Sequence, residues 1–313
     1  MSTSIVYLDG PWSFTTDPHD IGELEAWYAR TSGFGRQVPV PSPWQLYGRD
    51  LQDYTGAAWY YRACEVPEAW LSQRVQLHVG ASDYLTRVWM NGQFVGEHAG
   101  GYTPFVLDAT EAARAGVNHL VIRVYDPRDN TEIPHGEQGR SFTRISGIWQ
   151  PVHLQLRAAC HLTRLLPKPA LNPDRVDVIA ELSLADATKV RFVLLDAAGE
   201  EVATAEVDSA DGVAKATLAP PSPRRWSPED PYLYRVQAAV LDGGDRLECH
   251  TGLREVWAID GRLYLNGKPL FLRGAVTQGY WPETLYAAPT DEAIQKEIRL
   301  AKEAGFNVLR PHG

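Results

Sequence analysis

Short runs of alternating apolar and polar residues, each ended by a turn signal, constrain the fold of this sequence most. Residues 74–79 alternate strictly, and a period of two places one face of a β-strand against a core. Residues 86–98 form two such runs around Asn91-Gly92, a dipeptide favoured in type I′ hairpin turns because both central residues need positive φ. With 26 glycines and 22 prolines to supply turns, the pattern predicts a mainly β chain rather than a helical bundle.

The runs fall into two stretches, and the pattern changes after residue 255. We expect a first β-sandwich over residues 1–158, a second over 159–255, and a different segment over 256–313. Helical patterns within the first sandwich are short and cover only residues 21–30 and 110–115.

The last segment contains the one convincing helix, over residues 290–304. Thr290 is a suitable N-cap, and Gly305 suits the position that follows a helix. Strands at 270–274 and 307–310 flank the helix, so we predict a βαβ unit with parallel strands.

Charge and cysteine content argue against several classes of protein. Thirty basic against 39 acidic residues give a net charge of −9, so we expect neither nucleic acid nor a membrane as a partner. The sequence lacks a signal-peptide pattern, and no apolar run reaches ~18 residues, so we expect a cytoplasmic protein. Cys64, Cys160 and Cys249 have no metal-ligand spacing and are predicted to be free thiols, with a Cys160–Cys249 bridge as the alternative. The triplet 135–137 (His-Gly-Glu) is too weak a ligand signal to predict a metal, and no cofactor is predicted.

Several motifs, in order along the chain, carry a family signature. They are VPVPSPWQ and DYTGAAWYYR (38–62), ASDYLTRVWMNGQFVGEHAGGYTPF (81–105), SGIWQPVHL (146–154), WSPEDPYLY (226–234), and LNGKPLFLRG with KEAGFNVLRPHG (265–313). In these motifs the chain resembles the N-terminal part of glycoside hydrolase family 2, which includes β-galactosidases, β-glucuronidases and β-mannosidases. The resemblance implies a jelly-roll sugar-binding domain over 1–158, an immunoglobulin-like sandwich over 159–255, and the incomplete start of a (β/α)8 barrel over 256–313.

The resemblance also implies a reaction, the exo-acting, retaining hydrolysis of a terminal sugar from a β-glycoside or oligosaccharide. Retention needs two carboxyl groups about 5–5.5 Å apart, and in the family both are glutamates on later barrel strands. We therefore expect no catalytic residue here, a chain inactive by itself, and a gene fragment or shortened sequence. The loop glutamates are not paired by their spacing and are expected to be solvated; they are Glu97, Glu132, Glu137 and Glu283.

Two other interpretations remain open at this point. The chain can be a non-catalytic carbohydrate-binding module, or an oligomerisation module in which residues 256–313 dock onto the sandwiches or onto a second copy, giving a homo-oligomer.

The resemblance nominates substrate-binding residues in two regions. Arg310 and His312 match an Arg and a His after the second barrel strand, near the base of the sugar pocket, although Arg310 can instead pair inside the barrel. Ser141 stands where β-glucuronidases carry an Asp that reaches the active site, with Arg144 close by, and this departure argues against glucuronidase activity.

A further loop and one tryptophan complete the candidates. The loop 45–56 offers Asp50 and Asp53, because family sugar-binding loops can reach the barrel mouth. Trp281 follows the first predicted barrel strand, where barrel active sites form, and is a candidate platform for a sugar ring. The other tryptophans considered are more typical of a sandwich core; they are Trp44, Trp59 and Trp89.

Overall fold

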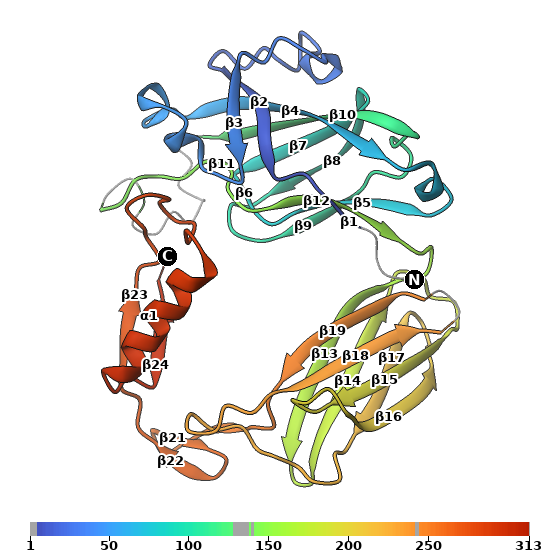
Figure 1. Ribbon diagram of the computed structural model, residues 1–313, viewed down its shortest axis with the longest axis vertical. Helices are drawn as coiled ribbons and strands as arrows, with labels where there is room; N and C mark the ends of the chain where they lie inside the picture. The colour runs from blue at the N-terminus through green and yellow to red at the C-terminus, as the bar shows by residue number, and fades with distance from the viewer. Residues whose placement is uncertain (1–4, 128–137, 139–140, 242–243, 313) are drawn as a thin grey trace. The chain divides into compact units, whose positions relative to one another are not determined.

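The computed structural model describes residues 5–127, 138, 141–241 and 244–312, and it is mainly β (Figure 1). The chain divides into two compact units. The N-terminal unit combines residues 5–156 with residues 274–312, and the middle unit comprises residues 157–273. The predicted third segment, 256–313, is therefore shared between the two units.

The N-terminal unit contains a six-stranded sheet, β3-β2-β4-β10-β7-β8, whose neighbours are all antiparallel, a four-stranded sheet, β1-β12-β5-β9, and the pair β11-β6. The strands are β1 (Ile5–Tyr7), β2 (Gly10–Asp17), β3 (Arg36–Val40), β4 (Gly56–Val66), β5 (Arg74–Val79), β6 (Ser82–Asp83), β7 (Leu85–Met90), β8 (Gln93–Ala99), β9 (Phe105–Asp108), β10 (Gly116–Asp126), β11 (Gly147–Ile148) and β12 (Val152–Arg157). Short 3-10 turns connect them at η1 (Trp27–Ala29), η2 (Trp44–Leu46), η3 (Arg49–Leu51) and η4 (Glu68–Trp70).

The two larger sheets face each other across one core, which makes this part of the unit a β-sandwich. The core cluster draws Trp12 and Ile122 from the six-stranded sheet and Leu77 and Leu154 from the four-stranded sheet. The buried positions on β5 alternate as the sequence predicts. The predicted hairpin at Asn91-Gly92 is also confirmed, since both residues have positive φ between β7 and β8.

The outer face of the six-stranded sheet carries a second aromatic cluster. Trp59 and Trp89 stack 5.5 Å apart, and Tyr28 stacks on Trp89 at 5.3 Å. The helix expected over 21–30 is absent: this stretch forms turns and η1. The reason is the carboxylate of Asp17, which accepts hydrogen bonds from Ile21 and Gly22 backbone N–H groups and Trp59 Nε1, and so bends the segment over the cluster. The stretch 110–115 is likewise a turn.

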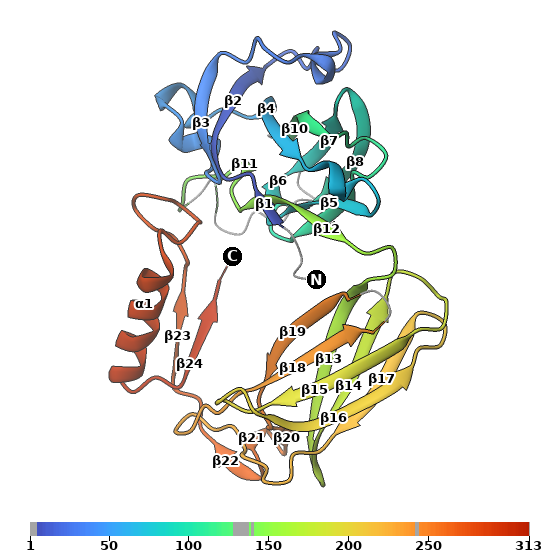
Figure 2. The same ribbon diagram turned by 45° about the vertical axis from the view of Figure 1, so that its right-hand side comes forward.

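The middle unit is a second sandwich with its own core. Its antiparallel sheets are β13-β14-β17 and β16-β15-β18-β19, followed by β20-β21-β22 (Figure 2). The strands are β13 (Leu162–Leu171), β14 (Asp174–Leu182), β15 (Lys189–Leu195), β16 (Glu201–Asp208), β17 (Val213–Leu218), β18 (Tyr234–Val240), β19 (Arg246–Thr251), β20 (Val256–Ile259), β21 (Arg262–Leu265) and β22 (Lys268–Leu270). Cys160 and Cys249 are free in this unit, and Cys64 is free in the other, as predicted.

Residues 274–312 form the predicted βαβ arrangement, with β23 (Gly274–Thr277) parallel to β24 (Val308–Pro311) and α1 (Asp291–Glu303) beside them (Figures 1 and 2). Thr290 caps α1 by accepting a hydrogen bond from the Ala293 N–H at 3.2 Å. The strand expected over 270–274 was misplaced, because Leu270 pairs with Leu263 in a hairpin and the parallel strand begins at Gly274. No helix among the described residues is long and apolar enough to cross a bilayer.

Candidate functional site

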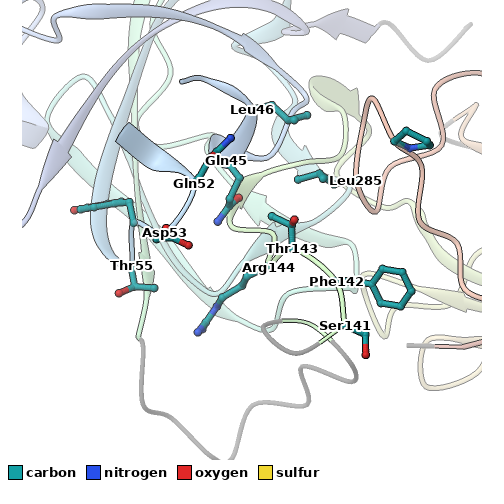
Figure 3. Close-up of a pocket in the computed structure, with 12 residues that line it drawn as sticks. Gln45, Leu46, Gln52, Asp53, Thr55, Ser141, Phe142, Thr143, Arg144 and Leu285 are labelled. Atoms are coloured by element: carbon teal, nitrogen blue, oxygen red, sulfur yellow. The ribbon is translucent and has the colours of Figure 1, made fainter. Parts of the chain in front are cut away.

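A cavity of about 980 Å³ lies in the N-terminal unit, where three segments distant in sequence meet. Figure 3 shows Asp53 and Thr55 on one side of it, Ser141 and Phe142 on another, and Arg144 between them. The lining residues are Gln45, Leu46, Gln52, Asp53, Tyr54, Thr55, Ser141, Phe142, Thr143, Arg144, Pro282 and Leu285. The lining is therefore rich in amide, hydroxyl and charged groups.

Trp44 fixes the first lining segment, which begins at η2. Its side chain is fully buried, its indole Nε1 donates to the Tyr54 carbonyl at 3.2 Å, and its backbone N–H donates to the Ser146 carbonyl at 3.0 Å. Trp44 thus joins the loop 45–55 to the segment that carries Ser141 and Arg144. The core interpretation of this tryptophan is correct, and Trp59 and Trp89 are buried as well.

Asp126, at the end of β10, orients two lining residues, Arg144 directly and Gln45 through Ser146. Its fully buried carboxylate accepts from Arg144 Nη2 and, at 2.5 Å, from Ser146 Oγ. Ser146 in turn exchanges two hydrogen bonds with the Gln45 amide, at 2.8 and 3.0 Å. Burial raises the pKa of Asp126, while the hydrogen bonds from Ser146 and Arg144 act to lower it. The orientation of both Gln45 and Arg144 therefore depends on one buried carboxyl group.

Aromatic contacts hold the third wall of the cavity, residues 280–287. Tyr280 stacks on Phe142 at 4.2 Å, and its hydroxyl donates to the Thr143 carbonyl at 3.2 Å. Tyr286 makes an edge contact with the Trp149 ring at 5.3 Å. Leu285 packs with this group against the sandwich, and this contact places it at the cavity.

The structure brings three of the predicted site residues together, since Asp53, Ser141 and Arg144 all line the cavity. Asp50 lies elsewhere: it forms an exposed ion pair with Arg36 at 2.7 Å and lines a separate pocket of about 300 Å³. The hydrogen bond from Arg36 lowers the pKa of Asp50.

The other three candidates do not line the cavity: Arg310 and His312 lie at the parallel strand pair, and Trp281 belongs to the segment 280–287 without being one of the lining residues. Trp281 lines a pocket of about 430 Å³ beside α1. His312 Nδ1 lies 3.1 Å from Gln278 Oε1, and Arg310 is exposed in register with Val276. Their proposed contact with a sugar stays a prediction.

Sequence reasoning missed Asp126 and Ser146, and it included Gln45 only as the first residue of the loop 45–56. The only local signal was an aspartate at the end of an alternating apolar strand, directly before Pro127. Among the loop glutamates, Glu97 pairs with Arg87 at 3.0 Å and Glu283 is exposed. Glu132, Glu137 and the triplet 135–137 lie outside the described residues. Within the described part of the chain, no group of three or more His, Cys, Asp or Glu side chains could hold a metal ion.

Comparison with known proteins gives consistent matches over this fold. Two family models match in succession: the sugar binding domain of glycosyl hydrolases family 2 over residues 5–157, and glycosyl hydrolases family 2 over residues 160–254. A β-galactosidase of Thermoanaerobacter pseudethanolicus is 28% identical over 285 residues, covering 83% of this chain and 36% of the relative. A β-glucuronidase of Paenibacillus borealis is 27% identical over 300 residues, covering 88% and 49%.

A solved structure shows the same fold. The β-glucuronidase from Ruminococcus gnavus in complex with N1-substituted uronic isofagomine aligns with a TM-score of 0.86 and 23% identity, covering 99% of this chain and 56% of that one. The chain thus spans roughly a third to a half of the curated relatives' length.

Proposed function

Because the chain belongs to glycosyl hydrolases family 2, we propose that it is the N-terminal region of a retaining, exo-acting glycoside hydrolase. The observation that carries this proposal is the pair of family models that match in order along one chain with the family's fold. The finer assignments, a jelly roll for residues 1–158 and an immunoglobulin-like sandwich for residues 159–255, belong to the proposal. The catalytic glutamates of this reaction are assigned to residues outside the present chain.

The cavity is proposed to contribute to the binding of a terminal sugar or its neighbour in an oligosaccharide. Asp53, Ser141 and Thr143 offer oxygen atoms that can accept from or donate to sugar hydroxyls. Arg144, in contrast, already pairs with the buried Asp126. Since the lining adds the carboxylate of Asp53, we expect the cavity to favour neutral sugars over uronic acids.

Residues 274–312 are proposed to be the first two strands and first helix of a (β/α)8 barrel. The supporting observations are the parallel pairing of β23 with β24 and the exposure of Ile294 and Ile298 on α1. Arg310 and His312 would then face the substrate side of the barrel, and Trp281 would lie in its first loop.

Sugar binding and turnover test the proposal separately. The chain is titrated with a neutral β-galactoside and, separately, with a β-glucuronide, and binding is followed by NMR. The signals of Asp53, Ser141 and Arg144 should shift at a lower concentration of the neutral sugar than of the glucuronide. Asp53→Asn should weaken binding, and the matched variant Asp50→Asn should not. Nitrophenyl glycosides should not be cleaved by this chain, and robust turnover would overturn the placement of the glutamates.

An oligomerisation module is the second candidate, supported by the exposed apolar residues on α1. Sedimentation over a range of concentrations separates the two: a stable homo-dimer whose formation is abolished by Ile298→Lys would favour this alternative. The cytoplasmic location and the absence of nucleic-acid or membrane partners stay predictions from composition.

A further inference from the structure

Asp83, the last residue of β6, is a fully buried carboxyl group beside the cavity. Neither of its oxygens has a hydrogen-bond partner among the described residues. The backbone of Gly101 packs directly against it, so that a Cβ at position 101 would lie 2.5 Å from Asp83 Oδ1. A buried carboxylate without donors is strongly unfavourable, so the environment favours the neutral acid.

The two charged neighbours of Asp83 act in opposite directions, since Asp126 raises its pKa and Arg144 lowers it. Among the described residues, the titratable groups that influence it or are influenced by it are Asp126 on β10, Arg144 before β11, Tyr102 after β8 and Tyr280 in the third wall. The guanidinium of Arg144 acts electrostatically on both carboxyl groups, Asp83 and Asp126. Asp126 accepts from both Arg144 and Ser146, whereas Asp83 accepts from neither. Asp126 therefore carries the negative charge, and Asp83 keeps the proton.

The third wall of the cavity forms part of the cover over this group. Tyr102 makes edge contacts with Trp149 and, at 5.7 Å, with Tyr286 of the wall, and the Trp149 indole donates to the Gly101 carbonyl at 2.8 Å. Leu285 belongs to the same cluster and also lines the cavity. The third wall thus contacts Tyr102, the neighbour of Gly101, whose backbone packs against Asp83.

We propose that Asp83 is a proton-controlled positioning residue: its neutral form keeps residues 280–287 docked on the sandwich, and its ionisation releases them and opens the cavity wall. The inference rests on the proposed function only where it treats the cavity as a sugar-binding site. The docking of residues 280–287 can be measured without any sugar.

The direction of the pH effect follows from linkage. Burial, and then the nearby Asp126, raise the pKa of Asp83 from its ordinary 3.8 to about 7, while Arg144 acts to lower it. Released from its cover, the carboxyl returns toward its ordinary pKa. The equilibrium constant for docking of residues 280–287 is therefore independent of pH below about pH 4. It falls by up to about tenfold per pH unit between about pH 4 and pH 7, and it is constant again above about pH 7.

Hydrogen exchange on the whole chain tests this. After correction for intrinsic rates, protection of the Trp281, Leu285 and Ala287 amides should fall by up to about 100-fold between pH 5 and pH 7. Asp83→Asn keeps the shape without the charge and should remove this dependence. Asp50→Asn, which neutralises an exposed aspartate outside the network, should behave like the wild type. Protection that does not change with pH in the wild type, or changes equally in Asp83→Asn, overturns the proposal.

A measurement on the unmodified chain covers the case in which Asp83→Asn does not fold. The ¹³C signal of the Asp83 carboxyl should titrate near pH 7, and a midpoint near 4 would refute the inference. If docking follows pH as expected but no sugar binds, the proposed function fails and the positioning role stands.

Discussion

Replacing Asp126 by alanine should destabilise the N-terminal unit more than any exposed charge removal. The change leaves Arg144, whose side chain is only 17% exposed, without its carboxylate, and breaking a buried ion pair in this way costs about 3–5 kcal/mol. It also removes the acceptor of the Ser146 hydroxyl, a loss of about 1–3 kcal/mol for a buried donor. The two losses share one network and do not add, so we expect about 3–5 kcal/mol in total.

Urea unfolding followed by hydrogen exchange of β4 and β10 amides measures this free energy for the N-terminal unit alone. Exchange is preferred over total fluorescence because two compact units need not unfold together. Asp50→Ala removes an exposed ion pair and should leave the value unchanged within error. Loss of less than about 1 kcal/mol in Asp126→Ala, with Arg144 still in place, would refute the assignment of Asp126 as the anchor of the cavity.

Three further outcomes follow from the structure. Gly147→Ala should lower the free energy of unfolding in urea by about 1–3 kcal/mol, because Gly147 has φ +86° and a Cβ there would press on Tyr60 and Trp44. The control Gly116→Ala has φ +81° but open space around the position, and it should cost less. Equal losses in the two variants would contradict the packing argument. Burial raises the pKa of the Cys64 thiol to about 11 and also raises that of the less buried Cys249, so alkylation of the native protein at pH 8 should be slower at Cys64 than at Cys249, and equal rates would be inconsistent with it. Thr290→Ala removes the side-chain cap of α1 and should lower the hydrogen-exchange protection of the α1 amides by about 1 kcal/mol. Unchanged exchange of these amides would contradict the capping role of Thr290.

The parts of the fold that sequence predicts are those that local patterns determine. The hairpin at Asn91-Gly92, the alternation on β5 and the cap at Thr290 each depend on residues within a few positions of one another. The prediction of a strand over 270–274 was wrong because an apolar run there is compatible with two pairings. The turn at Asn266-Gly267 instead lets Leu270 pair in an antiparallel hairpin.

The cavity shows the opposite case. Gln45 and Ser146, which exchange two hydrogen bonds, are separated by 101 positions, and Ser146 and Asp126 by 20. No periodicity in the sequence reports such pairs. The family resemblance named Asp53, Ser141 and Arg144 from loop positions in or next to its motifs, and it named Asp50 in the same loop as Asp53. The structure places the first three at the cavity and pairs Asp50 with Arg36 instead.

The buried charges beneath the cavity are better explained by orientation than by stability. Burial raises the pKa of both Asp83 and Asp126, which means that folding works against their ionisation. Replacing a whole buried ion pair by well-packed apolar residues, unlike removing one partner, is often neutral or stabilising. What apolar residues could not do is hold the Arg144 guanidinium and the Gln45 amide at fixed angles, through Asp126 and Ser146, on the two segments that line the cavity. The geometry of the cavity therefore depends on polar groups whose protonation can change, and this dependence connects its shape to pH through Asp83.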